Sequence, residues 1–410
     1  MAQAGASKTS ADAEVVALTR QLIAINSENP GHTEAEVAAF VARWFKDNGI
    51  TDVRVVEAAP GRPNVIARVP RTDGADGADG KGAGEGAGQA PPPLAFVGHM
   101  DTVPVGSGWT VDPFAGVIRD GRLYGRGSAD MKSGLAASML AARNIARRGL
   151  PLKRDLLVCA TADEEGTHML GAVGLLDQGI LGKDTLIIAP DGTGMEVIVA
   201  HKGVMWFELV THGKMSHAGS PEVGVDAVYG VAELIREIKR RFAELPYQHP
   251  LTGAPTVTFS VIEGGVKTNV VPDRCRVEID VRAVPPMTVK SVTELLRDVA
   301  ATAPKVLPGL TAEVRQINID RPPVESDLNS PVYRALADAC AAVLGARPEP
   351  RGLRGYTDAS IVSFRTGNLD AFVFGSGSIR QAHTADEWAS VDDIVATEKI
   401  FTRAAEALCL

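Results

Sequence analysis

The residues best suited to chemistry are histidines and carboxylates that directly follow short apolar stretches. His99 and Asp101 follow the run LAFV two residues apart, which puts them on one face of extended backbone. Asp130 comes later, after a glycine-rich turn at 125–128. Imidazole and carboxylate groups on a rigid frame are the ligands that hard and borderline cations prefer. This part of the chain therefore predicts the first half of a metal site.

Further residues of the same kinds follow later apolar runs. Glu164 and Glu165 follow LLVCAT, Asp191 follows TLIIAP, and His383 follows DAFVFG after a glycine-rich loop. In open α/β sheets the binding crevice lies at the carboxyl ends of the strands, so we expect these side chains to converge. The candidate metal ligands are His99, Asp130, Glu165, Asp191 and His383.

This set of ligands favours two metal ions over one. Two histidines and three carboxylates exceed the needs of a single tetrahedral zinc ion and suit a pair that shares a bridging carboxylate. Asp130, on a tight loop, is the expected bridge. Glu164 and Glu165 are neighbours whose side chains diverge, so one can bind metal while the other acts as general base. Asp101 is placed to accept the second ring N–H of His99 and orient the ring.

Composition excludes several other classes of protein. The chain has 410 residues and a net charge of -8, which argues against a nucleic-acid binder. It contains no long apolar run and no recognisable secretory signal, so a cytoplasmic protein is expected. The four cysteines are widely separated and are expected to be reduced, buried thiols.

The elements that must position these residues form two domains. Apolar strands alternate with helical segments up to residue 199 and again from 318, which predicts a catalytic α/β/α domain with a mixed, largely parallel sheet. Between them, residues 200–317 have the order β-α-β-β-α-β, which is typical of a ferredoxin-like layer. We expect this inserted part to be a dimerisation or lid domain. Residues 71–93, rich in Gly and Ala, are expected to form a flexible loop.

Six motifs occur in order between about residue 12 and the C-terminus. They are His99-Met-Asp101-Thr-Val-Pro, Gly125-Arg-Gly-Ser-Ala-Asp130-Met-Lys, Ala162-Asp-Glu164-Glu165-Gly, Met215-Ser-His217-Ala-Gly, Thr268-Asn269-Val-Val-Pro-Asp and His383-Thr-Ala-Asp-Glu. Together they resemble the di-zinc family of acetylornithine deacetylase, succinyl-diaminopimelate desuccinylase and glutamate carboxypeptidase.

The resemblance implies a role for each matching residue. It implies the five metal ligands given above, with Glu164 as base and Asp101 as the orienting residue. It also implies that His217 reaches the active site of a partner subunit and stabilises the oxyanion. Asn269 and Arg282 resemble substrate contacts of the family, and a guanidinium suits a bidentate grip on a carboxylate.

The expected function is that of a metal-dependent aminoacylase. Such a hydrolase would cleave the amide bond of an N-acyl amino acid by a metal-bound hydroxide, with two Zn²⁺ per chain and Co²⁺ or Mn²⁺ as substitutes. A carboxypeptidase or dipeptidase with the same two-metal site is the alternative. A non-catalytic metabolite-binding member of the family is the second alternative. The expected partners are a small substrate and a second copy of the chain, with neither nucleic acid nor membrane.

Overall fold

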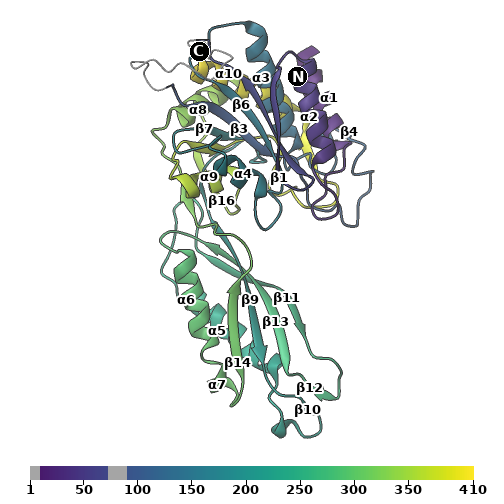
Figure 1. The fold of residues 1–410 in the computed structure, drawn as a ribbon, viewed down its shortest axis with the longest axis vertical. Helices are drawn as coiled ribbons and strands as arrows, with labels where there is room; N and C mark the ends of the chain where they lie inside the picture. The colour runs from purple at the N-terminus through teal and green to yellow at the C-terminus, as the bar shows by residue number, and fades with distance from the viewer. Residues whose placement is uncertain (1–9, 73–89) are drawn as a thin grey trace, which may run out of the picture. The chain divides into compact units, whose positions relative to one another are not determined.

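The computed structural model describes residues 10–72 and 90–410, and the chain divides into two compact units (Figure 1). The first unit runs up to Val199 and also contains Ser326–Arg351 and Thr357–Leu410. The second comprises Ala200–Glu325 and Gly352–Tyr356. The second unit therefore ends later than the expected residue 317 and includes a short segment from later in the chain. The catalytic role of the first unit and the dimerisation or lid role of the second stay predictions. Residues 73–89, most of the loop expected at 71–93, lie outside the described residues.

A mixed β-sheet forms the centre of the first unit. Its strands follow the order β1-β2-β6-β3-β7-β17-β8, and the four from β6 to β17 are parallel, while the outer pairings are antiparallel. This confirms the expected fold class of a mixed α/β sheet with a parallel centre. The strands are β1 (Asp52–Ala59), β2 (Arg62–Val69), β3 (Leu94–His99), β6 (Leu156–Thr161), β7 (Leu186–Ala189), β8 (Val197–His201) and β17 (Ala371–Val373). Two short strands, β15 (Val324–Glu325) and β16 (Pro350–Leu353), also pair with β8.

The parallel register brings the ends of the central strands to one edge. Every residue of β3 and β6 is buried, as expected of apolar runs that lie at the centre of a parallel sheet. His99, the last residue of β3, is paired with Thr161, the last residue of β6. Ala189 of β7 is likewise paired with Val373 at the end of β17. The loops that follow these four strands therefore all begin at the same edge.

Helices pack on this sheet through apolar contacts. In one group α3 contacts α1 and α10, and α10 contacts α8; in another, α4 contacts α9. The ring of Phe96 in β3 lies 5.0 Å from that of Phe401 in α10, which ties that helix to the centre of the sheet. The helices are α1 (Ser10–Ile23), α2 (Ala35–Asp47), α3 (Lys132–Arg148), α4 (Leu170–Asp177), α8 (Pro331–Leu344), α9 (Asp358–Thr366) and α10 (Val391–Cys409). No helix among the described residues is both long and apolar enough to cross a membrane.

A small three-stranded sheet links the C-terminal part of the chain to the loop before α3. It consists of β4 (Val117–Arg119), β5 (Arg122–Tyr124) and β18 (Trp388–Ser390). Trp388 is paired with Tyr124, and the next residue, Gly125, donates its N–H to the backbone oxygen of Glu387 at 3.0 Å. This pairing places the segment after His383 beside the glycine-rich turn that leads to Asp130.

The second unit is a ferredoxin-like layer of helices on an antiparallel sheet. Its strands follow the order β11-β13-β9-β14. One sheet face packs on α5 and α6 through an apolar core that includes Phe207 and Leu209. The main elements are β9 (Gly203–His212), α5 (Ala227–Ala243), β11 (Thr256–Gly264), β13 (Arg274–Ala283), α6 (Val289–Ala300) and β14 (Thr311–Gln316). The short elements are β10 (Ser216–His217), η1 (Pro221–Val223), β12 (Val270–Val271) and α7 (Ala303–Val306).

Glu208 joins three strands on the opposite face of this sheet. It lies between Phe207 and Leu209, so its side chain points away from the core. It accepts hydrogen bonds from Arg276 of β13 and, at 2.6 Å, from Arg315 of β14. The bonds from Arg315 and then Arg276 outweigh the effect of burial and lower the pKa of Glu208 to about 2.

Replacement of Glu208 by Gln should therefore destabilise the protein in a pH-dependent way. A pKa of about 2 lies below the ordinary 4.5, so the ion pairs stabilise the fold above pH 4.5 and lose this effect as the pH falls towards 2. We expect E208Q to lose about 1–2 kcal/mol at pH 7 in urea unfolding and much less at pH 3. The control is E263Q, because Glu263 is exposed and pairs with the same Arg276 at 3.2 Å. An equal loss for E208Q at both pH values would contradict the ion-pair explanation.

Candidate metal centre

The structure brings all five predicted metal ligands to one region of the first unit. His99 ends β3, and Asp130 lies in the turn before α3. Glu165 and Asp191 follow β6 and β7, and His383 lies in the loop between β17 and β18. Their side chains form two groups whose ligand atoms lie within 4.8 Å of one another: His99, Asp130 and Asp191 in one, and Asp130, Glu165 and His383 in the other.

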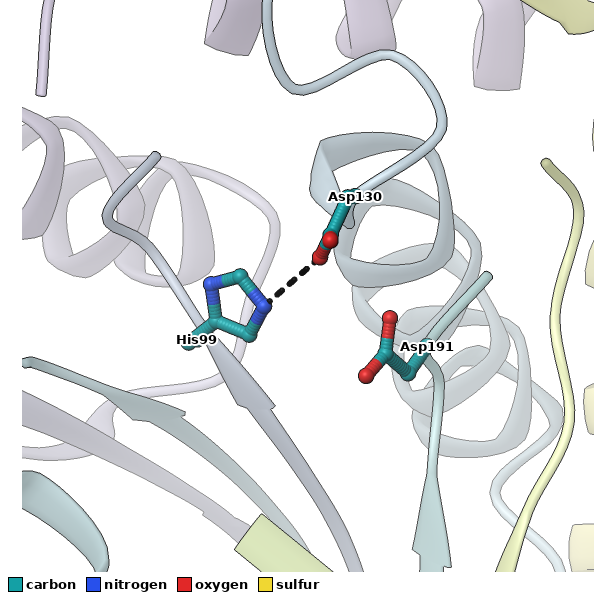
Figure 2. Close-up of side chains that lie close together, drawn as sticks. All are labelled: His99, Asp130 and Asp191. Carbon is teal, nitrogen blue, oxygen red and sulfur yellow. Dashed lines mark hydrogen bonds and ion pairs between the residues drawn. The ribbon is translucent and has the colours of Figure 1, made fainter. Parts of the chain in front are cut away.

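Asp130 belongs to both groups, and its two oxygens face different histidines. Figure 2 shows His99 at the end of its strand, with Asp130 and Asp191 pointing towards the same space. Oδ1 of Asp130 lies 3.0 Å from Nε2 of His99, and Oδ2 lies 3.3 Å from Nε2 of His383. Glu165 completes the second group, with Oε1 3.0 Å from the same nitrogen of His383. This geometry suits a carboxylate that bridges two cations.

Electrostatics show that the cluster is suited to positive charge. Burial and neighbouring carboxylates raise the pKa of Asp191 to about 7 and raise those of Glu164 and Glu165. Hydrogen bonds to Asp130 and Glu165 raise the pKa of His383 to about 11. Burial also opposes the charged form of Asp130, but its bonds from His383 and His99 outweigh this and lower its pKa. Four half-buried carboxylates around two imidazoles fit a pair of divalent cations.

His99 is oriented mainly by a backbone group of Asp101. Its Nδ1 lies 3.0 Å from the backbone oxygen of Asp101 and 3.6 Å from the Oδ1 of that residue. A proton on Nδ1 leaves the lone pair of Nε2, on the side of Asp130, available to a cation. The closer partner is thus the carbonyl of Asp101 and not its carboxylate, which the sequence predicted. That carboxylate accepts the N–H groups of Glu164 and Glu165, each at 3.2 Å.

The two neighbouring glutamates point to different partners, as predicted, although they lie in a turn after β6 and not on extended backbone. Glu165 contacts His383 at 3.0 Å, while the Oε2 of Glu164 lies 4.0 Å from Nε2 of His99. Glu164 takes no part in the contacts of 3.0 to 3.3 Å that join Asp130 and Glu165 to the two histidines. Its carboxylate can therefore face a water molecule or a substrate beside the two groups.

Glu387 supports the Asp130 turn, a role that was not predicted from the sequence. It accepts the N–H of Ala129 at 2.8 Å and that of Asp130 at 3.1 Å, and it forms a buried ion pair with Arg126. The motif that begins at His383 ends at Glu387, so a signal was present in the sequence. Its partners, however, lie more than 250 residues earlier in the chain.

Glycines allow the loops around the site to pack closely. A Cβ atom on Gly192, next to Asp191, would lie 2.4 Å from the backbone oxygen of Ala129. Gly377 has a φ of +88°, and its Cβ would lie 2.5 Å from the Cα of the same Ala129. Side chains at these positions would push the Asp130 turn away from its neighbours.

The other three predicted site residues belong to the second unit and fall into two places within it. His217 and Asn269 are neighbours, because β10 pairs with β12 and Ala218 donates its N–H to the backbone oxygen of Asn269 at 3.0 Å. Arg282 lies near the far end of β13, roughly 26 Å along the strand from its start. Its guanidinium makes two hydrogen bonds to Asp280, at 2.7 and 3.0 Å. The structure thus gives Arg282 a carboxylate partner of its own chain and does not bring it to His217.

Comparison with known proteins identifies the family. The model of peptidase family M20/M25/M40 matches residues 95–407, a range that contains all ten predicted site residues. The chain belongs to this family. It is 32% identical over 340 residues to an acetylornithine deacetylase from Myxococcus xanthus, covering 80% of this chain and 82% of that protein.

Solved structures show the same fold at lower identity. A tripeptidase from Staphylococcus aureus matches with a TM-score of 0.75 and 23% identity, over 97% of this chain and 98% of that one. Human carnosine dipeptidase 1 matches with a TM-score of 0.75 and 16% identity, over 97% and 96% of the two chains. A dinuclear metal binding peptidase of the M20 family from Bacillus subtilis matches with a TM-score of 0.68 and 18% identity, over 98% and 99%.

Family membership confirms the resemblance found in the motifs. It makes the protein a metal-dependent hydrolase that acts on amide bonds. The identity of the metal, the substrate, and the role of each site residue go beyond this and are treated as proposals.

Proposed function

We propose that the protein is a zinc-dependent deacylase that hydrolyses the amide bond of an N-acyl amino acid with a free carboxylate. The observation that carries this proposal is the 32% identity to an acetylornithine deacetylase, which extends over 82% of that enzyme. The two ligand groups that share Asp130 support the proposal, because they could hold the two metal ions that such a reaction uses.

The proposed centre holds two Zn²⁺ ions, for which Co²⁺ or Mn²⁺ could substitute. His99 and Asp191 would hold one ion, Glu165 and His383 the other, and Asp130 both. When bound, the ions polarise the substrate carbonyl and lower the pKa of a water molecule. The donor set fits zinc, because imidazole nitrogen and carboxylate oxygen are among its usual ligands.

Glu164 is the proposed general base. Its carboxylate would take the proton from the attacking water at Oε1 or Oε2 and then deliver it to the leaving amine nitrogen. Asp101 holds the N–H groups of Glu164 and Glu165, so it fixes the backbone from which base and ligand diverge. Burial raises the pKa of Glu164, which favours uptake of the proton.

The second unit is proposed to supply the oxyanion contact from a partner subunit. Arg282 and His217 lie too far apart within one unit for a single small substrate to contact both. As the family resemblance implies, His217, with Asn269 beside it, would act in the active site of the other copy, while Arg282, after leaving Asp280, would bind the substrate carboxylate. The exposed side chains of Tyr229 and Ile262 offer apolar surface for a homodimer through this unit.

Mixing of two inactive variants would test the shared site. E164Q lacks the base and H217A lacks the oxyanion contact, so a dimer with one chain of each contains one site with both groups. We expect a denatured and refolded 1:1 mixture to recover about a quarter of wild-type activity, since half the dimers are mixed and each has one intact site. Recovery no greater than the sum of the two variants alone would contradict the exchange of His217.

A carboxypeptidase or dipeptidase is the second candidate, favoured by the fold shared with a tripeptidase and a dipeptidase. A panel of N-acetyl amino acids, N-succinyl amino acids and unacylated dipeptides, assayed with Zn²⁺, Co²⁺ and Mn²⁺ in turn, separates the two. We expect the highest kcat/KM on an N-acyl amino acid. Preferential cleavage of the dipeptides would replace the deacylase by the peptidase.

A further inference from the structure

A buried chain of hydrogen bonds approaches the metal centre from the N-terminal part of the first unit. Asn29, in the loop after α1, donates through Nδ2 to the Oδ2 of Asp101 at 2.9 Å and to the Oδ1 of Asp163 at 3.0 Å. Its own Oδ1 accepts a hydrogen bond from Nη2 of Arg62 at 2.9 Å. The amide of Asn29 thus joins two carboxylates to one guanidinium.

Arg62 is itself held by a buried carboxylate. Its Nη1 donates to the Oε1 of Glu34 at 2.6 Å, and Glu34 is fully buried. The two terminal nitrogens of the guanidinium therefore have different hydrogen-bond partners, Glu34 and Asn29, and Nη1 also lies 3.7 Å from the Oδ1 of Asp163. An asparagine amide can bind in either of two orientations, and a donor at its oxygen allows only the one that presents the NH₂ to the carboxylates.

The two carboxylates held by Asn29 control the backbone of residues 163–165. Asp101 accepts the N–H groups of Glu164 and Glu165, each at 3.2 Å. Asp163 has a φ of +59°, a left-handed conformation that is costly for a residue other than glycine. Glu34 accepts the N–H of Asp163 at 3.2 Å, and the Oδ2 of Asp163 accepts that of Leu170 at 3.3 Å. Contacts on several sides thus hold this turn, from which the two glutamates diverge.

We propose that Arg62, with Asn29 and Glu34, is a positioning residue for the base Glu164 and the ligand Glu165. It contacts neither of them and acts through Asn29, Asp101 and Asp163. This inference rests on the roles of Glu164 and Glu165 proposed above. The family match begins only at residue 95, so all three positioning residues lie outside the matched range.

The test combines metal binding with kinetics. The wild type, R62M, R62K and N29A are stripped of metal, and Zn²⁺ affinity is measured by competition with a chromophoric chelator. For R62M and N29A we expect at least one Zn²⁺ to bind about 10–100-fold more weakly, as is typical when a partner of a metal ligand is lost. At saturating Zn²⁺, kcat on the best substrate should fall about tenfold or more while KM changes less than about threefold.

R62K and R68M separate positioning from charge and from general loss of stability. A lysine keeps the charge but lacks the planar pair of donors, so R62K should keep most of the defect. Arg68 lies on the same strand, β2, and pairs with Asp155 at 2.8 Å. We expect R68M to bind Zn²⁺ and turn over like the wild type. If R62M does not fold, N29A tests the same link while leaving the Arg62–Glu34 pair intact.

Different outcomes overturn different claims. Wild-type Zn²⁺ affinity and kcat in R62M or in N29A would overturn the positioning role, as would an equal defect in R68M. Full recovery in R62K would show that charge alone suffices and would also overturn it. Failure of the wild-type apoprotein to bind Zn²⁺ would instead overturn the proposed centre, and with it this inference.

Discussion

Replacement of Glu164 by Gln is expected to lower kcat by about 10²–10⁴-fold while leaving metal content near that of the wild type. The amide has nearly the shape of the carboxylate but cannot take the proton from the attacking water. The carboxylate of Glu164 comes no closer to either ligand group than 4.0 Å, the distance from its Oε2 to Nε2 of His99. Its replacement should therefore not release metal. Steady-state kinetics and elemental analysis of the same preparation measure the two effects together.

The neighbouring residue supplies the control for this prediction. E165Q removes a carboxylate that contacts His383 at 3.0 Å, so it should lower the bound metal as well as the rate. The two variants are chemically identical changes one position apart. Hydrolysis retained in E164Q would show that Glu164 is not the base, and metal lost equally from both variants would show that their roles are not distinct.

Replacement of Asp130 by Asn is expected to have the largest effect on metal content. The wild type should bind close to two ions per chain, and D130N at most one, because Asp130 is the one residue common to both ligand groups. A neutral amide offers one weakly basic oxygen in place of a carboxylate whose two oxygens face two histidines. Hydrolysis should fall with the metal content, by about 100-fold or more.

D120N is the matched control for D130N. Asp120 is an exposed residue in the turn between β4 and β5, and its φ of +51° is one that asparagine tolerates. It should retain two ions and full activity. Elemental analysis after dialysis distinguishes the variants. One ion per chain in the wild type, or two in D130N, would rule out the bridge.

Much of the centre could be predicted because its parts are local. His99, Glu165 and Asp191 follow apolar strands, and parallel strands end at a common edge, so their convergence follows from the pattern of the sequence. The divergence of Glu164 and Glu165 was predicted from the alternation of side chains along extended backbone, whereas in the structure it arises in a turn that begins with the left-handed Asp163. The fold class follows from the same alternation of strands and helices.

The supporting contacts could not be predicted in the same way. Glu387 binds the N–H groups of Ala129 and Asp130 because β18 pairs with β5, and these strands are too short to give a clear signal in the sequence. The carbonyl of Asp101, rather than its carboxylate, is the closer partner of His99 because Asn29 and two backbone N–H groups occupy the carboxylate.

The sequence by itself determined which residues have the chemistry for the proposed two-metal site and which strands carry them, because ligand type and strand periodicity are properties of short segments. Only the tertiary structure decided how that site is held. Arg62, Asn29 and Asp101 are far apart in the chain and have ordinary local surroundings. Their hydrogen bonds exist because the sheet places β2 two strands from β3 and because a buried polar group must find a partner.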